Sequence, residues 1–261
     1  MENTQNNEEN LADVYSNLGV KKDDVVFLHI NPLPFGLVAD TKEDFVKFFI
    51  DPLREVLGSG GTFAVLTYTY SYGLEGKPYI HEESPSEAGI LTEAVRQLPG
   101  ALRSLHPLIS ITALGSKAEY ITQNVTRDAF GWGSPFSRLH ELKAKCLYVG
   151  MTCGVSCSFL HYVEQMFGVS HCYNKAYFHP VYKNGAEVKG PFLAFVRNRK
   201  SKPYDYSGFE SEMKTRGHVR DTKYKGAPLQ VVELEQCFLV GMEMLDRDPC
   251  AFIQEPFYIT K

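Results

Sequence analysis

Apolar residues in this 261-residue chain fall into short continuous runs that are separated by turn-forming residues. The runs at 25–30, 62–68 and 146–151 have the length of strands and carry no polar alternation, which predicts strands buried on both faces. Two further strands are predicted at 109–114 and 192–196. Buried strands of this type are typical of a parallel sheet covered by helices.

Helix signals lie between these runs. A helix is predicted over 11–18, a second over 42–57 with Thr41 as its N-cap, and a third over 85–97 with Ser84 as its N-cap. Each of the two caps is followed three residues later by an acidic residue, as in a capping box. The chain therefore predicts an α/β fold, with three layers (α/β/α), a largely parallel central sheet and a C-terminal elaboration, in one domain over 1–261.

Sheets of this class bind ligands beyond the carboxyl ends of their strands. The loop 31–36, which holds two prolines and a glycine, follows the first strand. The aromatic segment 68–72 follows the second. We expect both to border the site.

Charge and composition narrow the class of protein. The chain has 27 Lys and Arg against 31 Asp and Glu, a net charge of -4, so it lacks the basic footprint that nucleic-acid binding requires. Residues 1–10 are polar and acidic and contain no apolar signal-peptide core, and no run approaches eighteen apolar residues. We expect a cytoplasmic protein that acts on small molecules, away from membranes and nucleic acid.

Two histidines are candidates for chemistry. His161 and Glu164 are three residues apart in a helical pattern, so both lie on one helix face, where the carboxylate can orient the imidazole as a general base. His106 precedes Pro107, which favours an extended backbone at a turn. For either histidine, the alternative is a hydrogen-bonded packing residue.

Six cysteines in a chain of this length and compartment indicate free thiols and no disulfide framework. Cys153, Cys157 and His161 recur every four residues with Cys172 nearby, and if helical this stripe could offer ligands to zinc. Buried cysteines more often act as small apolar residues, so we expect no metal. A nucleophilic pair of Cys157 with His161 remains open.

Other polar residues suit the rest of an acyl transfer. The hydroxyl of Ser110 or Ser158 could donate to a developing oxyanion. Glu75, Glu82 and Glu83 form an acidic cluster that could hold a polycation, or simply a solvated loop.

Five motifs together resemble one family. They occur in order at 18–24 (LGVKKDD), 85–86 (PS), 103–107 (RSLHP), 133–136 (GSPF) and 159–164 (FLHYVE). In these motifs the chain is similar to the aminoglycoside 3-N-acetyltransferase family, over about residues 11–185.

The resemblance implies an acetyl-CoA-dependent N-acetyltransferase on a three-layer fold, acting on an amine of an amino sugar or aminoglycoside. It implies His161 as general base, Glu164 as its orienting carboxylate, and an active-site lining that includes Arg103, Ser104 and His106. Antibiotic resistance is one role that fits, and acetylation of a nucleotide-linked or cell-surface amino sugar is another.

The resemblance also places the CoA donor beside the loop after the first strand. Family members typically read H-S-S-L-S there, whereas this chain has His29-Ile30-Asn31-Pro32-Leu33, and Pro32 has no N–H to offer. The predicted cofactor-binding residues are Asn31, Pro32, Leu33, Arg103, Ser104 and Ser110. The predicted substrate-binding residues are Tyr68, Tyr70, Glu75 and Ser158.

Three functions therefore compete. The first is direct acetyl transfer from acetyl-CoA with a histidine base. The alternatives are a catalytically silent or CoA-binding family member, which the altered loop keeps open, and a cysteine-dependent acyltransferase or hydrolase. The oligomeric state is open, and a homodimer is compatible with the sequence.

Overall fold

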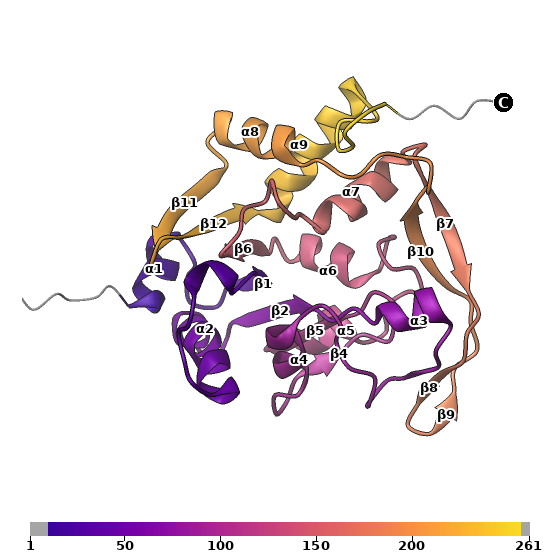
Figure 1. The fold of residues 1–261 in the computed structure, drawn as a ribbon, viewed down its shortest axis with the longest axis horizontal. Coiled ribbons are helices and arrows are strands. Elements are labelled where there is room, and N and C mark those ends of the chain that lie inside the picture. The colour runs from indigo at the N-terminus through magenta and orange to yellow at the C-terminus, as the bar shows by residue number, and fades with distance from the viewer. Residues whose placement is uncertain (1–9, 257–261) are drawn as a thin grey trace, which may run out of the picture.

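The computed structural model describes residues 10–256, with a seven-stranded mixed sheet at its centre (Figure 1). In spatial order its strands are β11 (Val219–Tyr224), β12 (Ala227–Glu233), β6 (Lys145–Val149), β1 (Val25–Ile30), β2 (Thr62–Leu66), β5 (Ile111–Gly115) and β4 (Leu102–Arg103). The three middle strands β6, β1 and β2 are parallel, and the flanking pairs are antiparallel. The predicted parallel sheet is thus confined to its centre.

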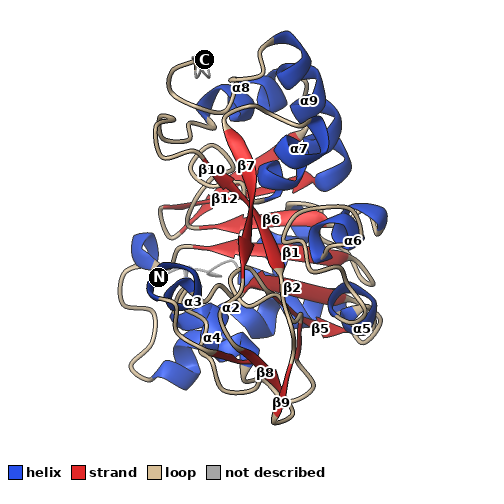
Figure 2. Cartoon of the chain, turned by 90° about the vertical axis from the view of Figure 1, so that its right-hand side faces the viewer, coloured by secondary structure: helices blue, strands red, loops and turns tan. Residues whose placement is uncertain are grey.

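Helices cover both faces of this sheet, and Figure 2 shows the two helical layers on either side of the strands. One layer consists of α1 (Leu11–Asn17), α2 (Lys42–Leu57) and α4 (Ile90–Arg96). The other consists of α5 (Ala118–Thr122), α6 (Pro135–Glu141), α7 (Phe159–Phe167) and α9 (Leu234–Arg247), with α8 (Ser207–Thr215) packed beside α9. The predicted three-layer α/β/α architecture is confirmed.

Side chains along each central strand point alternately to the two faces of the sheet, so the core consists of one apolar cluster on each face. Val26 and Leu28 of β1 lie in the apolar cluster under α1 and α2, whereas Phe27 lies in the cluster on the opposite face. Because both faces of each central strand are buried, the residues pointing to either face are apolar, which explains the continuous apolar runs in the sequence. Because β12 pairs with β6, the C-terminal part of the chain completes the sheet and is no separate appendage.

Helix starts agree with the sequence at one cap and disagree at another. Thr41 Oγ1 accepts a hydrogen bond from the amide of Asp44 at 3.1 Å, as a cap should. The predicted start of the helix over 85–97 is wrong, because α4 begins only at Ile90, whereas its end at Arg96 agrees with the prediction. Glu87, the supposed second half of the capping box, instead accepts hydrogen bonds from the amide and hydroxyl of Ser71.

Smaller elements lie beyond the carboxyl end of the parallel strands. They are η1 (Leu33–Phe35), α3 (Tyr70–Glu75), the ribbon of β7 (Cys172–Tyr177) with β10 (Phe192–Arg197), and the sheet of β3 (Tyr79–Ile80), β8 (Val181–Lys183) and β9 (Ala186–Glu187). In Figure 1 the ribbon occupies the right-hand side, next to α3. Tyr72 of α3 and Tyr177 of β7 bring the two together, with ring centroids 6.1 Å apart.

Within residues 10–256, no helix combines the length and apolar character needed to cross a membrane. Residues 1–9, most of the segment that lacks a signal-peptide pattern, lie outside the described range.

Candidate active site

The helix α7 carries the proposed base to the carboxyl end of the central strands. The chain leaves β6 at Val149, turns through 150–158 and enters α7 at Phe159. The helix ends at Phe167, and its cap Gly168 has a φ of 84°, the left-handed conformation typical of glycine at this position. His161 therefore lies in the first turn of a helix that starts where ligands bind in this architecture.

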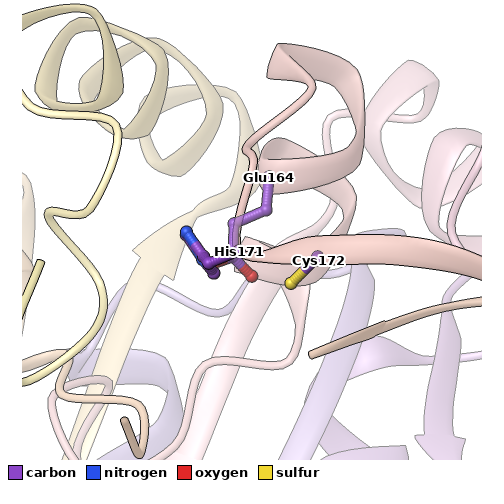
Figure 3. A group of neighbouring side chains, drawn as sticks. All are labelled: Glu164, His171 and Cys172. Carbon is purple, nitrogen blue, oxygen red and sulfur yellow. The ribbon is translucent and has the colours of Figure 1, made fainter. Parts of the chain in front are cut away.

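A buried carboxylate joins two histidines at this point. His161 Nδ1 lies 3.2 Å from Glu164 Oε2, and His171 Nε2 lies 2.8 Å from Glu164 Oε1. The side chains of Glu164 and His171 are fully buried, whereas that of His161 is 23% exposed. Figure 3 shows Glu164 reaching from α7 toward His171, with Cys172 beside them where β7 begins.

Because Glu164 is ionised, the nitrogen of each histidine ring that faces it must carry a hydrogen. Burial alone would raise the pKa of this carboxyl, but the hydrogen bonds and charges of His161 and His171 outweigh it and hold the pKa below its usual range. An ionised carboxylate only accepts, so His161 donates from Nδ1 and His171 donates from Nε2. In the neutral ring Nε2 of His161 is then the lone-pair acceptor, and it has no hydrogen-bond partner within the described residues.

A cavity of about 280 Å³ lies in front of His161. Its ring-bearing walls are Tyr68, Tyr70, Phe130, Tyr177, Phe195 and Tyr204. The ring of His161 lies between two of them, with centroids 5.2 Å from Phe130 and 4.8 Å from Tyr204. A larger hollow of about 770 Å³ lies at the amino end of β2, near Arg54 and Gly61, away from the proposed base.

Two of the four predicted substrate-binding residues line the cavity, and the other two do not. Tyr68 and Tyr70 line the cavity. Ser158 is buried behind it and shares a hydrogen bond of 2.7 Å with His29 Nε2. Glu75 points to solvent and pairs with Lys77 at 2.7 Å, outside the cavity lining.

Three predicted cofactor-binding residues lie inside the protein. Arg103 is buried and donates to Ser110 Oγ, to the carbonyls of Ser84 and Thr67, and to Thr69 Oγ1. Ser110 in turn donates to the carbonyl of Thr67 at 2.6 Å.

Ser104 is fully buried as well, and its hydroxyl accepts from the amide of Ile111 at 3.0 Å. These contacts join β4 and β5 to the end of β2. They leave the hydroxyl of Ser110 no geometry for the oxyanion role considered from the sequence.

His106 occupies a similar internal position. Its Nε2 donates to the carbonyl of Leu193 at 2.9 Å, and its Nδ1 accepts from the amide of Ile109 at 3.0 Å. Burial lowers the pKa of His106 to about 4, so the ring is neutral at pH 7. A direct catalytic part for His106 stays a prediction, and these contacts favour a role in fixing the 103–107 turn against β10.

The backbone amides of the loop after β1 are all used within the protein. The amide of Asn31 donates to Val149, that of Leu33 to the Asn31 side chain, and those of Phe35 and Gly36 to carbonyls in the same turn. The two prolines of 31–36 have no N–H. No backbone amide of 31–36 is therefore free for a pyrophosphate in this structure, and donor binding by Asn31, Pro32 and Leu33 stays a prediction.

The cysteine pattern of the sequence does not form a helical stripe. Because α7 begins at Phe159, Cys153 and Cys157 belong to the preceding turn, and both are fully buried. A different group brings donor atoms together, since those of Glu164, His171 and Cys172 lie within 4.8 Å of one another. Burial raises the pKa of the Cys172 thiol to about 12, and a proton already joins the other two, which suits a hydrogen-bond cluster better than a metal centre.

His171 is the main site residue that the sequence did not reveal. Replacing His171 with leucine should lower the free energy of unfolding at pH 7 by about 1–3 kcal/mol, because Glu164 stays buried with one donor fewer. A lowered carboxyl pKa adds stability above the usual value near 4.5, and this gain is lost as the pH falls through the lowered pKa. Urea midpoints should therefore differ most at pH 7 and converge in acid.

His171→Gln is the matched variant, since its amide can still donate to Glu164. It should recover part of the stability. Equal urea midpoints for wild type and His171→Leu at pH 7 would show that Glu164 does not depend on this histidine.

Comparisons with known proteins agree with the geometry. The family model described as aminoglycoside 3-N-acetyltransferase matches residues 35–246. Aminoglycoside N(3)-acetyltransferase IV from a Salmonella species is 30% identical over 169 residues, which are 60% of this chain and 59% of that protein. Aminoglycoside N(3)-acetyltransferase VIII from Streptomyces fradiae is 25% identical over 261 residues, 88% of each chain. The match to the Salmonella relative thus covers less than two thirds of its length.

Solved structures share the fold. Aminoglycoside acetyltransferase AAC(3)-Xa superposes with a TM-score of 0.78 at 21% identity, over 94% of this chain and 93% of that one. AAC-IIIb in its binary complex with CoASH gives a TM-score of 0.77 at 23% identity, over 95% and 97%.

Proposed function

This chain belongs to the aminoglycoside 3-N-acetyltransferase family, and from that premise we propose that it transfers an acetyl group from acetyl-CoA to an amine of an amino sugar or aminoglycoside. His161 is the general base in this proposal. The observation that carries it is that His161 lines the cavity with Nε2 unpartnered, while Nδ1 is held by the ionised Glu164. Relatives support both substrates, since AAC-IIIb binds CoASH and AAC-VIa binds sisomicin.

The chemistry requires little else from the protein. An amine is mostly an ammonium at neutral pH, and it must lose a proton before its lone pair can attack the thioester carbonyl. The ammonium proton goes to solvent, and His161 Nε2 takes a second proton from the nitrogen as the N–C bond forms. The C–S bond then breaks, and the imidazolium returns a proton to the departing thiolate, leaving an amide and CoASH. Glu164 stabilises the imidazolium in between, as a carboxylate does when it orients a catalytic histidine.

A cysteine-based mechanism finds no support in the geometry. Cys157 is fully buried in the turn before α7. The ring of His161 packs against Phe130 and Tyr204 and hydrogen-bonds to Glu164, and within residues 10–256 it forms no hydrogen bond with a thiol.

The test is an assay with acetyl-CoA and a panel of amines, scored by free thiol release and by product mass. We expect thiol release only when an amine is present, with one acetylated product for each thiol. Thiol release without an amine would indicate a hydrolase. Acetyl-CoA binding by calorimetry without any transfer would indicate a silent family member.

A further inference from the structure

Within residues 10–256 no carboxylate lines the cavity at His161, because the ionised Glu164 lies behind that histidine and is hydrogen-bonded to His161 and His171. Among the described residues that line it there is no aspartate or glutamate, and Arg197 is the one residue with a permanent positive charge. The remaining lining is aromatic or aliphatic, apart from Gly73 and His161. A polycationic acceptor would therefore meet aromatic rings and a guanidinium where it needs carboxylates.

Arg197 lies one ring away from the proposed base. Its guanidinium carbon is 5.5 Å from the centroid of Tyr204, and the ring of Tyr204 is 4.8 Å from that of His161. Arg197 Nη1 donates to the carbonyls of Ser201 and Lys202, which hold the side chain in place. Within residues 10–256 it forms no ion pair with a carboxylate, so its charge is uncompensated at the cavity wall.

The turn that follows β10 extends this positive edge. Arg199 and Lys200 are exposed, and neither has an ion pair within the described range. Lys202 pairs with Glu255 at 3.3 Å. Cations on a cavity rim repel a ligand that carries several ammonium groups before it docks.

The carboxylates that the sequence offered for a polycation lie elsewhere. None of Glu75, Glu82 and Glu83 lines the cavity. Asp128 lies close to one wall, but its two oxygens already accept from two backbone amides and a glutamine side chain.

We propose that the acceptor of this enzyme carries a single ammonium group on an uncharged or anionic body that stacks on the aromatic walls, and that Arg197 excludes polycationic acceptors. The inference rests on the proposed acetyl transfer. A monoamine places its one nitrogen at His161 and its body against rings such as Tyr68 and Tyr204. It has no second ammonium group for Arg197 to repel.

The experiment compares kcat/KM for three acceptors, with acetyl-CoA held constant. Glucosamine and tyramine each carry one amine, whereas kanamycin carries several. We expect the wild-type enzyme to favour the better monoamine over kanamycin by at least about 10-fold. Arg197→Glu should move that ratio toward kanamycin by about 10-fold or more, because a repulsive charge becomes an attractive one. Arg199→Glu makes the same charge change on the same turn outside the cavity lining, and it should leave the ratio within about threefold.

The possible outcomes distinguish a failure of the proposed acceptor class from a failure of the proposed acetyl transfer. A wild-type preference for kanamycin, or an unchanged ratio in Arg197→Glu, would overturn the acceptor class while acetyl transfer stands. A raised KM for acetyl-CoA with unchanged acceptor ratios would instead assign Arg197 to the phosphates of the donor. If no amine releases thiol, the proposed function fails and this inference fails with it. Arg197→Gln keeps a donor for the turn carbonyls and replaces the glutamate variant if that protein does not fold.

Discussion

His161→Ala should lower kcat for amine acetylation by about 100-fold or more and leave the fold intact. The imidazole is 23% exposed and faces the cavity, so its removal leaves no buried void. Glu164 loses one hydrogen-bond donor but keeps His171, so the free energy of unfolding should fall by only about 1 kcal/mol. Steady-state assays with saturating amine and acetyl-CoA, with urea unfolding beside them, measure both effects.

His179→Ala is the matched control, because His179 is an exposed histidine outside the cavity lining. It should keep wild-type turnover. A folded His161→Ala protein that turns over within a few-fold of wild type would remove His161 as the base. The acyl transfer would then have to draw its proton acceptor from another group at the cavity.

The parts of this fold that the sequence predicts are those set by local pattern. β1, β2 and β6 are continuous apolar runs because a helical layer covers each face, so the run itself reports the burial. The His161–Glu164 contact follows from an i, i+3 spacing on one helix, which needs no knowledge of tertiary structure.

The contact of His171 with Glu164 could not be predicted from a local pattern. His171 follows the glycine that ends α7 and belongs to the entry into β7, so no helical period connects it to Glu164. Its approach to the carboxylate depends on how the chain reverses after Gly168. Tyr204 and Arg197 reach the cavity in the same way, from the β10 side of the ribbon. A pattern within one element does not encode contacts made by two elements that meet in space.

Motif residues raise a different difficulty, because a motif does not say whether a residue binds a ligand or builds the site. The 103–107 segment illustrates this. The resemblance places it at the active site, whereas the structure turns Arg103, Ser104 and His106 inward to β2, β5 and β10. Their contact with a cofactor stays a prediction that stability measurements can separate from a structural role.

Arg103→Met should lower the free energy of unfolding by about 3–5 kcal/mol, which corresponds to a fall in Tm of about 10 °C. The guanidinium is buried and donates at 2.5–2.9 Å to four oxygens, from Ser110, Ser84, Thr67 and Thr69. Methionine fills much of the space but donates no hydrogen bond, so these largely buried acceptors lose their partner. Thermal unfolding at pH 7 measures the loss.

Arg199→Met controls for the loss of an arginine at an exposed position, and its Tm should stay within a degree or two of wild type. Arg103→Lys should fall between the two, because a single ammonium cannot reach carbonyls on separate segments as a planar fork does. If Arg103 is instead a cofactor contact, its replacement should leave Tm unchanged and raise KM for acetyl-CoA. A large fall in Tm with unchanged KM in the folded fraction would establish that the arginine of the RSLHP motif builds the wall of the site and leaves donor recognition to other side chains.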